Sequence, residues 1–205
     1  MSILLSLSRT IDRLSAWIGR WVAWLVLAAV LISATNAAVR KAFDYSSNAF
    51  LEIQWYLFSA VFLLAAGYTL MRQDHVRIDV ILGRFSKRTQ IWIDVFGICV
   101  FLLPFVVAVI DLSWPLVWRA YVSGEMSSNA GGLIRWPVFA LLPLGMVLLG
   151  LQGISELIKR IAFLRVLIPD PTQRGQAKSA EEELAEFMQK QRDEKSAAEL
   201  REGAR

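Results

Sequence analysis

Four long apolar segments fill most of the first 160 residues. They span residues 16–39, 50–70, 91–112 and 136–158. A helix rises about 1.5 Å per residue, so about 20 apolar residues are needed to cross a hydrocarbon core roughly 30 Å thick. Each segment meets that length. The sequence therefore predicts an all-α integral membrane protein with four transmembrane helices.

The composition supports this prediction over a soluble helical bundle. Hydrophobic residues make up 56% of the chain, and residues 21–32 and 95–110 are apolar on every helical face. Such helices offer water no polar face. A cleaved signal peptide is the alternative for the first segment, but its apolar run exceeds the usual length of about 7–15 residues. We therefore expect an uncleaved first helix.

The basic residues indicate the orientation of the four helices. Eleven Lys or Arg residues lie before or at the start of the first segment, between the second and third, and just after the fourth, against four in the two opposite connections. Loops rich in Lys and Arg stay in the cytoplasm. An even number of spans also requires both termini on one side. We therefore expect both termini to be cytoplasmic.

Three further regions are expected outside the four spans. Apolar residues recur every three or four positions in residues 1–15 and again in residues 78–85, with basic residues on the other face. This pattern predicts amphipathic helices lying in the membrane interface; the alternative is that each extends the neighbouring span. Residues 169–205 are highly charged and predict a cytoplasmic tail, partly helical or disordered.

The search for chemical motifs mostly excludes classes of function. His75 is the sole histidine and Cys99 the sole cysteine, so bis-histidine haem ligation and cysteine metal clusters cannot form within one copy. The chain has no nucleotide-binding fingerprint. Its net charge of +4 arises in the membrane part, where basic residues set orientation, and does not indicate nucleic-acid binding. We expect no enzyme, no cofactor and no metal site.

Two carboxylates about one turn inside their spans are the polar groups of most interest. Glu52 is expected to lie near Arg40 or Lys41, and Asp94 near Arg88. Local ion pairing is one interpretation, and a salt bridge to another subunit is the other. The remaining polar residues near the spans are expected at span ends, where water or headgroups solvate them: Asn36, Gln54, Asp111, Gln152 and Glu156.

Aromatic, proline and small residues shape the expected packing. Tryptophans and a tyrosine cluster near predicted span ends, as in an aromatic belt: Trp17, Trp21, Trp55, Tyr56, Trp92, Trp114, Trp118 and Trp136. Trp17, Trp21 and Trp24 share one helical face, which anchors the helix in the interface or docks a partner helix. Prolines 104 and 143 are expected to kink their spans. Glycines 145, 150 and 153 permit close helix approach.

Several short motifs, in order, resemble one known family. They are Glu52-Ile53-Gln54-Trp55, His75-Val76-Arg77-Ile78-Asp79, Arg88-Thr89-Gln90 with Ile93-Asp94, the stretch from Ser127 to Leu133, Arg135-Trp136-Pro137, and Leu151-Gln152-Gly153. Together with the four-span frame, they resemble the DctQ-type small permease subunit of TRAP (tripartite ATP-independent periplasmic) transporters, in the mannitol/chloroaromatic branch. The resemblance covers roughly residues 10–168.

The resemblance implies a non-catalytic partner in transport. In that family a periplasmic binding protein captures a small organic anion, and a large membrane subunit moves it inward with sodium. The small subunit binds and braces the large one. The candidate interface residues are Glu52, Trp55, His75, Arg77, Asp79, Asp94 and Trp136. The connection 118–135 is expected to face the periplasm, as a docking loop or an ordinary one. The competing hypothesis is a self-contained four-span transporter or channel that works as a homo-oligomer.

Overall fold

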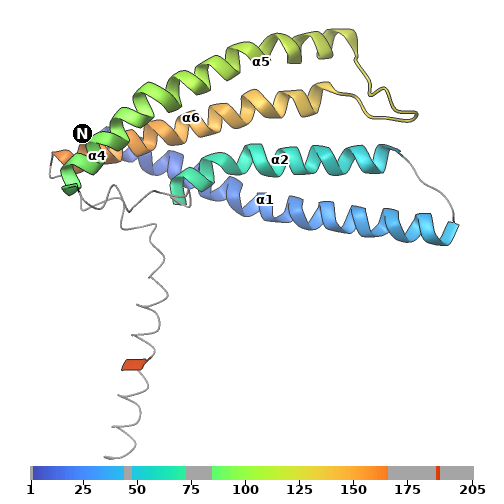
Figure 1. Cartoon of the computed structure of the whole chain (residues 1–205), viewed down its shortest axis with the longest axis horizontal. Helices are drawn as coiled ribbons and strands as arrows, with labels where there is room; N and C mark the ends of the chain where they lie inside the picture. The colour runs from blue at the N-terminus through green and yellow to red at the C-terminus, as the bar shows by residue number, and fades with distance from the viewer. Residues whose placement is uncertain (1, 44–47, 73–84, 166–187, 190–205) are drawn as a thin grey trace, which may run out of the picture. The chain divides into compact units, whose positions relative to one another are not determined.

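The computed structural model describes residues 2–43, 48–72, 85–165 and 188–189. These residues are helical except at 85–86, 124–135 and 165. The chain divides into two units, Met1–Pro171 and Thr172–Arg205. The first unit is a bundle of long helices (Figure 1). In the second unit the structure describes only residues 188–189, which are helical. The expected tail of residues 169–205 therefore lies almost wholly outside the described residues.

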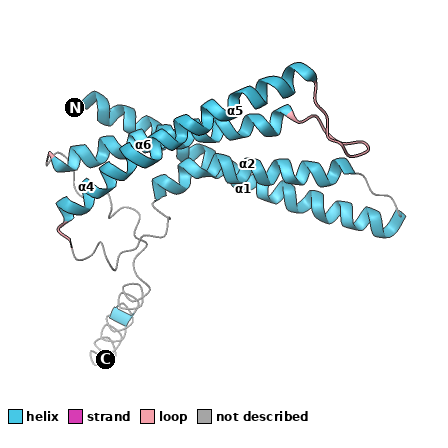
Figure 2. Cartoon of the chain, turned by 45° about the horizontal axis from the view of Figure 1, so that its top comes forward, coloured by secondary structure: helices cyan, strands magenta, loops and turns pink. Residues whose placement is uncertain are grey.

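Four helical stretches are long and apolar enough to cross a membrane, which confirms the predicted fold class. Helix α1 spans Ser2–Phe43 and α2 spans Asn48–Arg72. The third stretch is built from α4 (Lys87–Gly97), the π-helical turn η1 (Ile98–Leu102) and α5 (Leu103–Ser123). The fourth is α6, Trp136–Leu164. Figure 2 shows the helices in a turned view, and within the described ranges no strand is present.

Two helix bounds differ from the sequence expectation. Helix α1 is continuous from Ser2, so the expected interfacial stretch and the first span form one helix. The position of residues 2–15 in the membrane interface stays a prediction. The third stretch continues to Ser123, well beyond residue 112, because Gly124 supplies the left-handed residue that ends it, at φ 60°. Trp118 is therefore helical and not part of a loop. The other expected interfacial stretch, 78–85, lies outside the described residues except for Phe85.

The proline at 104 coincides with a change in helix type. Pro104 has no N–H to donate, and its ring would clash with the preceding turn of an α-helix. The π-helical turn η1 comes directly before it, and the N–H of Leu103 donates to the carbonyl oxygen of Ile98, five residues back. A wider turn of this kind accommodates the ring without ending the helix.

Helix α6 forms the centre of the bundle. It packs against α1, α2 and α5, and a larger share of it is buried than of any other described span. Its glycines permit this packing: a Cβ at Gly145 would lie 2.7 Å from the carbonyl oxygen of Leu63, and one at Gly153 would lie 2.8 Å from Leu102 Cδ2. Small residues let membrane helices approach to backbone contact. The expected close approach of this helix is therefore confirmed.

Candidate functional site

Polar side chains gather at two places in the bundle, at opposite ends of α6. The first is the α1–α6 polar cluster, which joins α1, α4 and α6. It consists of Ser8, Asp12, Ser15, Asp94, Gln152, Ser155, Glu156, Lys159 and Arg160. The second is the Glu52 clamp, in which the Glu52 carboxylate of α2 holds the loop between α5 and α6.

Within the α1–α6 polar cluster, every described bond from α1 to another helix goes to α6. Ser15 Oγ donates to Gln152 Oε1 at 2.7 Å, and Gln152 Nε2 donates to Asp12 Oδ1 at 3.0 Å. Ser155 Oγ donates to the same Asp12 oxygen at 2.8 Å. The hydroxyls of Ser8 and Ser155 are 2.8 Å apart. Gln152 and Ser155 have no exposed surface, so these bonds replace water completely.

The charged members of the cluster form a continuous chain of ion pairs. Lys159 Nζ lies 3.2 Å from Asp12 Oδ2 and also pairs with Glu156. Arg160 Nη1 lies 2.5 Å from Glu156 Oε2, and its Nε lies 3.1 Å from Asp94 Oδ2. Glu156 is 1% exposed and Arg160 4% exposed. Buried charges are tolerated when they are paired in this way. The cluster therefore fixes α1 and α4 against α6.

The Glu52 clamp uses neutral donors. Asn129 Nδ2 donates to Glu52 Oε1 at 2.7 Å, the backbone N–H of Leu133 donates to Oε2 at 2.6 Å, and the Ser127 hydroxyl also donates to Oε1. Gly132 packs against this site, because a Cβ there would lie 2.5 Å from Ser127 Cβ and 2.9 Å from Glu52 Oε1. The carboxylate therefore sets the shape of the loop.

The clamped loop is a small hairpin that is also held at its base. Met126 and Ile134 form an isolated antiparallel bridge, and Arg135 Nη1 lies 3.0 Å from Glu125 Oε1. Gly131 has a φ of 71°, a left-handed conformation that glycine adopts without strain. Gly131 therefore lets the chain turn within the hairpin. Further bonds from α2 reach the loop: Tyr56 Oη donates to the Ile134 carbonyl oxygen at 2.9 Å.

The structure brings the predicted interface candidates to different places. Glu52 is buried and bonds the loop, and Asp94 bonds Arg160; both of these partners lie far away in the sequence. Trp55 is 74% exposed on α2. Trp136 packs edge-to-face on Tyr121, with ring centroids 5.6 Å apart. His75, Arg77 and Asp79 lie outside the described residues. The candidates therefore do not form one site among the described residues.

Sequence reasoning missed the depth of burial of the polar face of α6. Gln152 and Glu156 were expected at a span end among water and headgroups, yet both are buried. A usable signal was present, since Gln152, Glu156 and Arg160 recur every four residues and so share one helix face. A polar stripe inside an otherwise apolar helix marks a face turned toward other helices.

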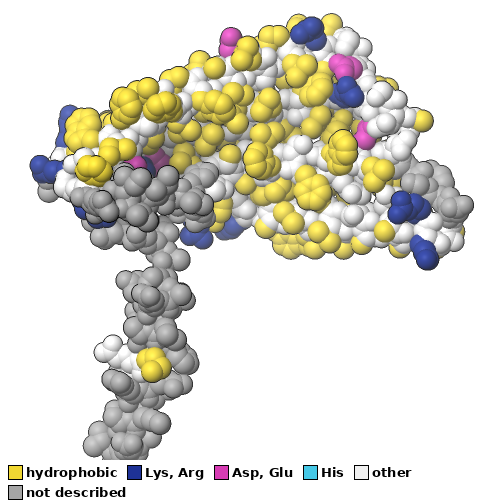
Figure 3. Space-filling model, in the orientation of Figure 1, with side chains coloured by type: hydrophobic (Ala, Val, Ile, Leu, Met, Phe, Trp, Pro, Cys, Tyr) yellow, Lys and Arg dark blue, Asp and Glu magenta, His cyan; other side chains and the backbone are white. Residues whose placement is uncertain are grey.

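The outer surface of the bundle is apolar. Figure 3 shows mostly hydrophobic side chains over the visible face of the helices. An apolar hollow on α1 is lined by Trp17, Trp21 and Trp24 together with Leu64 of α2. These three tryptophans are more than half exposed, and they share one face as expected. Among the described residues no group of three His, Cys, Asp or Glu side chains can hold a metal ion. The exposed apolar faces suit packing against lipid or protein.

A comparison with protein families finds a match over most of the chain. The family described as "Tripartite ATP-independent periplasmic transporters, DctQ component" matches residues 29–163. The match runs from within α1 to the end of α6, and it includes the Glu52 clamp and the α6 side of the polar cluster. No curated protein and no solved structure matches the chain.

Proposed function

The chain belongs to the DctQ family, a component of tripartite ATP-independent periplasmic transporters, and from this premise we propose that it acts as a scaffold that braces the large permease subunit. The family is a transporter component and is not catalytic. The bracing role, the coupling to sodium and the uptake of a small organic anion are parts of the proposal. So are insertion in the bacterial inner membrane and the cytoplasmic position of both termini.

The observation that carries the proposal is the way the four spans are fastened. The α1–α6 polar cluster holds one end of the bundle and the Glu52 clamp holds the other, while the glycines of α6 bring backbones into contact between them. A brace must keep its shape while another subunit moves against it. Buried ion pairs and close backbone packing resist such deformation.

The outer faces suit a protein that works beside another membrane protein. Exposed tryptophans on α1 and α2 offer large, stiff apolar contacts, with Trp55 the most exposed of them. Tryptophan is enriched at protein interfaces and at membrane boundaries. We propose Trp55 as a contact to the large permease. Glu52 and Asp94 are engaged inside the chain, so we propose that they act by holding the loop and α4 in place.

The loop between α5 and α6 is the proposed contact to the periplasmic binding protein. Its hairpin shape is held from α2 by Glu52 and Tyr56, so it presents a defined surface. If both termini are cytoplasmic, this loop faces the periplasm. An ordinary connecting loop would not need a buried carboxylate to fix its shape.

The test is co-expression with the large permease subunit of a transporter of this family. Co-purification of the two chains is expected, together with sodium-dependent uptake only when both chains and the binding protein are present. The matched control is each chain expressed alone. Uptake by this chain alone would overturn the scaffold proposal and favour a self-contained homo-oligomeric transporter or channel.

A further inference from the structure

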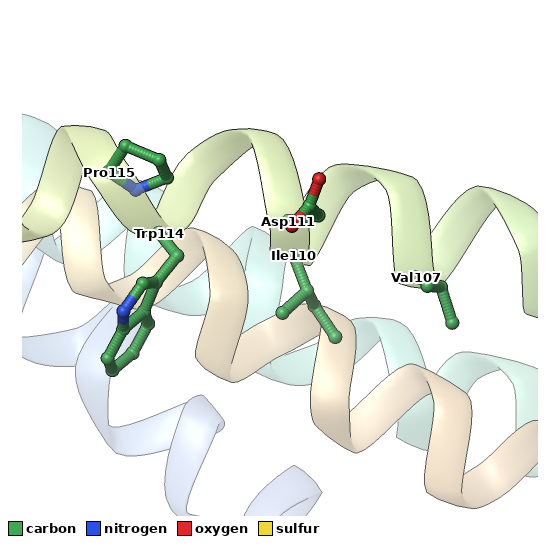
Figure 4. A pocket seen from close by; sticks show the side chains of 5 residues that line it. All are labelled: Val107, Ile110, Asp111, Trp114 and Pro115. Carbon is green, nitrogen blue, oxygen red and sulfur yellow. The ribbon is translucent and has the colours of Figure 1, made fainter.

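One carboxylate of the bundle lies on an outer face. Asp111 of α5 is exposed, and it forms no hydrogen bond or ion pair within the described part of the chain. It borders a hollow lined by Val107, Ile110, Trp114 and Pro115. Figure 4 shows Asp111 between Val107 on one side along the α5 axis and Trp114 and Pro115 on the other. A charged group therefore projects from an apolar surface.

The register of α5 against α6 places Asp111 near the middle of the spans. Tyr121 contacts Trp136, and Val106 faces Gly150, so α5 and α6 run antiparallel and Asp111 lies level with the turn around Gly145. Gly145 is about 14 Å from Trp136 and about 21 Å from Lys159 along α6, at 1.5 Å per residue. The sequence alone put Asp111 at a span end, because the apolar run stops there while the helix continues to Ser123.

A second acceptor lies at the same point. Pro115 stands inside α5, four residues after Asp111, and has no N–H to donate to the Asp111 carbonyl oxygen. The carbonyl oxygen of Asp111 therefore lacks its usual α-helical donor, in the same residue as the exposed carboxylate. Lipid chains offer no donor to either group. The position calls for a donor from another molecule.

The surroundings of Asp111 have the pattern of a helix-binding face. Val107, Asp111, Trp114 and Trp118 follow an i, i+4, i+7, i+11 spacing, which places them along one face of α5. Val107 is 65% exposed, and Trp114 and Trp118 are each 59% exposed. Trp114 lies about 10 Å from the level of Tyr121 at 1.5 Å per residue, deeper than a boundary anchor. An amphipathic partner helix is recognised through anchors with this spacing.

We propose that this face of α5 binds a transmembrane helix of the large permease subunit, and that Asp111 pairs there with a Lys or Arg side chain of that helix. The inference rests on the proposed function. Charge complementarity decides the occupant. A lipid chain leaves the carboxylate without a counter-ion. An apolar helix with a cationic side chain both neutralises the carboxylate and packs against the apolar residues of this face.

The first test measures co-purification of the large permease with variants of the full chain. Asp111→Leu and Asp111→Asn are expected to reduce co-purification at least about tenfold, because each leaves the partner's cation unpaired. Asp111→Glu keeps the charge and should stay within about threefold of the unchanged protein. Leu112→Ala is the matched control, since Leu112 is 77% exposed on the other side of α5 from Val107 and Trp114. It should leave co-purification unchanged.

Stability of the chain alone separates an interface role from a structural one. Asp111→Leu removes a charge from an apolar surface, so the isolated chain in detergent should melt at the same or a higher temperature. A lower melting temperature, with a parallel loss of co-purification, would mean that Asp111 supports the fold, and would overturn the proposal.

The second test is photo-crosslinking in the assembled complex. A photoreactive residue at Val107 or Trp114 should crosslink to the large permease several-fold more than one at Phe105 or Leu112, which are exposed on the other side of α5. Crosslinks from Val107 to a second copy of this chain, or equal yields on both sides, would overturn the proposal. If the unchanged chain binds the permease while the Asp111 variants bind as well as it does, this inference fails and the proposed function stands.

Discussion

The two polar sites at opposite ends of α6 both hold carboxylates inside the bundle, but the partners of these carboxylates differ. In the α1–α6 polar cluster, buried and half-buried carboxylates face two cations, Lys159 and the buried Arg160, and the result is a fixed arrangement of three helices. In the Glu52 clamp, a buried carboxylate faces hydroxyl, amide and backbone donors, and the result is a fixed loop. A charge between helices needs a counter-charge, whereas a carboxylate beside a loop finds free backbone donors.

This difference sets an order among the effects of mutation. Removing one partner of a buried ion pair leaves a charge without compensation, which costs more than losing neutral hydrogen bonds at a partly solvated site. An exposed ion pair should matter least. Three substitutions, one at each kind of contact, test this order.

The largest effect is expected from Arg160→Leu. The substitution leaves Glu156 and Asp94 without the guanidinium that they share, so the free energy of unfolding should fall by about 3–5 kcal/mol. Denaturant unfolding in detergent micelles measures it. Arg88→Leu is the control, because Arg88 is exposed on α4. An Arg160→Leu protein as stable as the unchanged one would contradict the role of the ion-pair chain.

An intermediate effect is expected from Glu52→Ala. Three donors of the loop lose their acceptor at a site near water, so unfolding should become easier by about 1–3 kcal/mol. Hydrogen exchange should rise mainly in the loop 124–135 and not in α1. Glu52→Gln, which keeps one acceptor oxygen, should fall between the unchanged protein and Glu52→Ala. Equal loss of protection in α1 would show that the two sites are not separate.

The smallest effect is expected from Arg135→Gln. The pair between Arg135 and Glu125 is more than a third exposed on both sides, so its loss should change stability by about 0–1 kcal/mol. Thermal unfolding of the Arg135→Gln and Glu52→Ala variants under the same conditions compares the two losses of stability. A loss larger than that of Glu52→Ala would reverse the proposed order within the loop.

The four spans could be predicted from the sequence because hydropathy and segment length are local properties. The end of the third helix was missed for a physical reason: Asp111, Pro115 and Arg119 interrupt the apolar run, while the backbone stays helical until Gly124. Helix ends are set by backbone geometry, and the left-handed residue at Gly124 was the better marker.

The partners of the buried polar groups could not be read from the sequence. Asp12 meets Ser155 across 143 residues, and Glu52 meets Leu133 across 81. Such pairings depend on which faces of the helices pack together, and that is decided by the glycines and the shape of α6. Sequence neighbours therefore could not point to the long-range partners, Leu133 for Glu52 and Arg160 for Asp94.

The central place of α6 has a consequence for the order of assembly in the membrane. Helix α6 is the last of the four spans to leave the ribosome, and it holds the groups to which Ser8, Asp12 and Ser15 of α1 bond. Those polar side chains therefore enter the membrane before their bonding groups on α6 exist. Insertion of the fourth span completes the bundle in one step, and a nascent chain stalled before it should be a target for quality-control proteolysis.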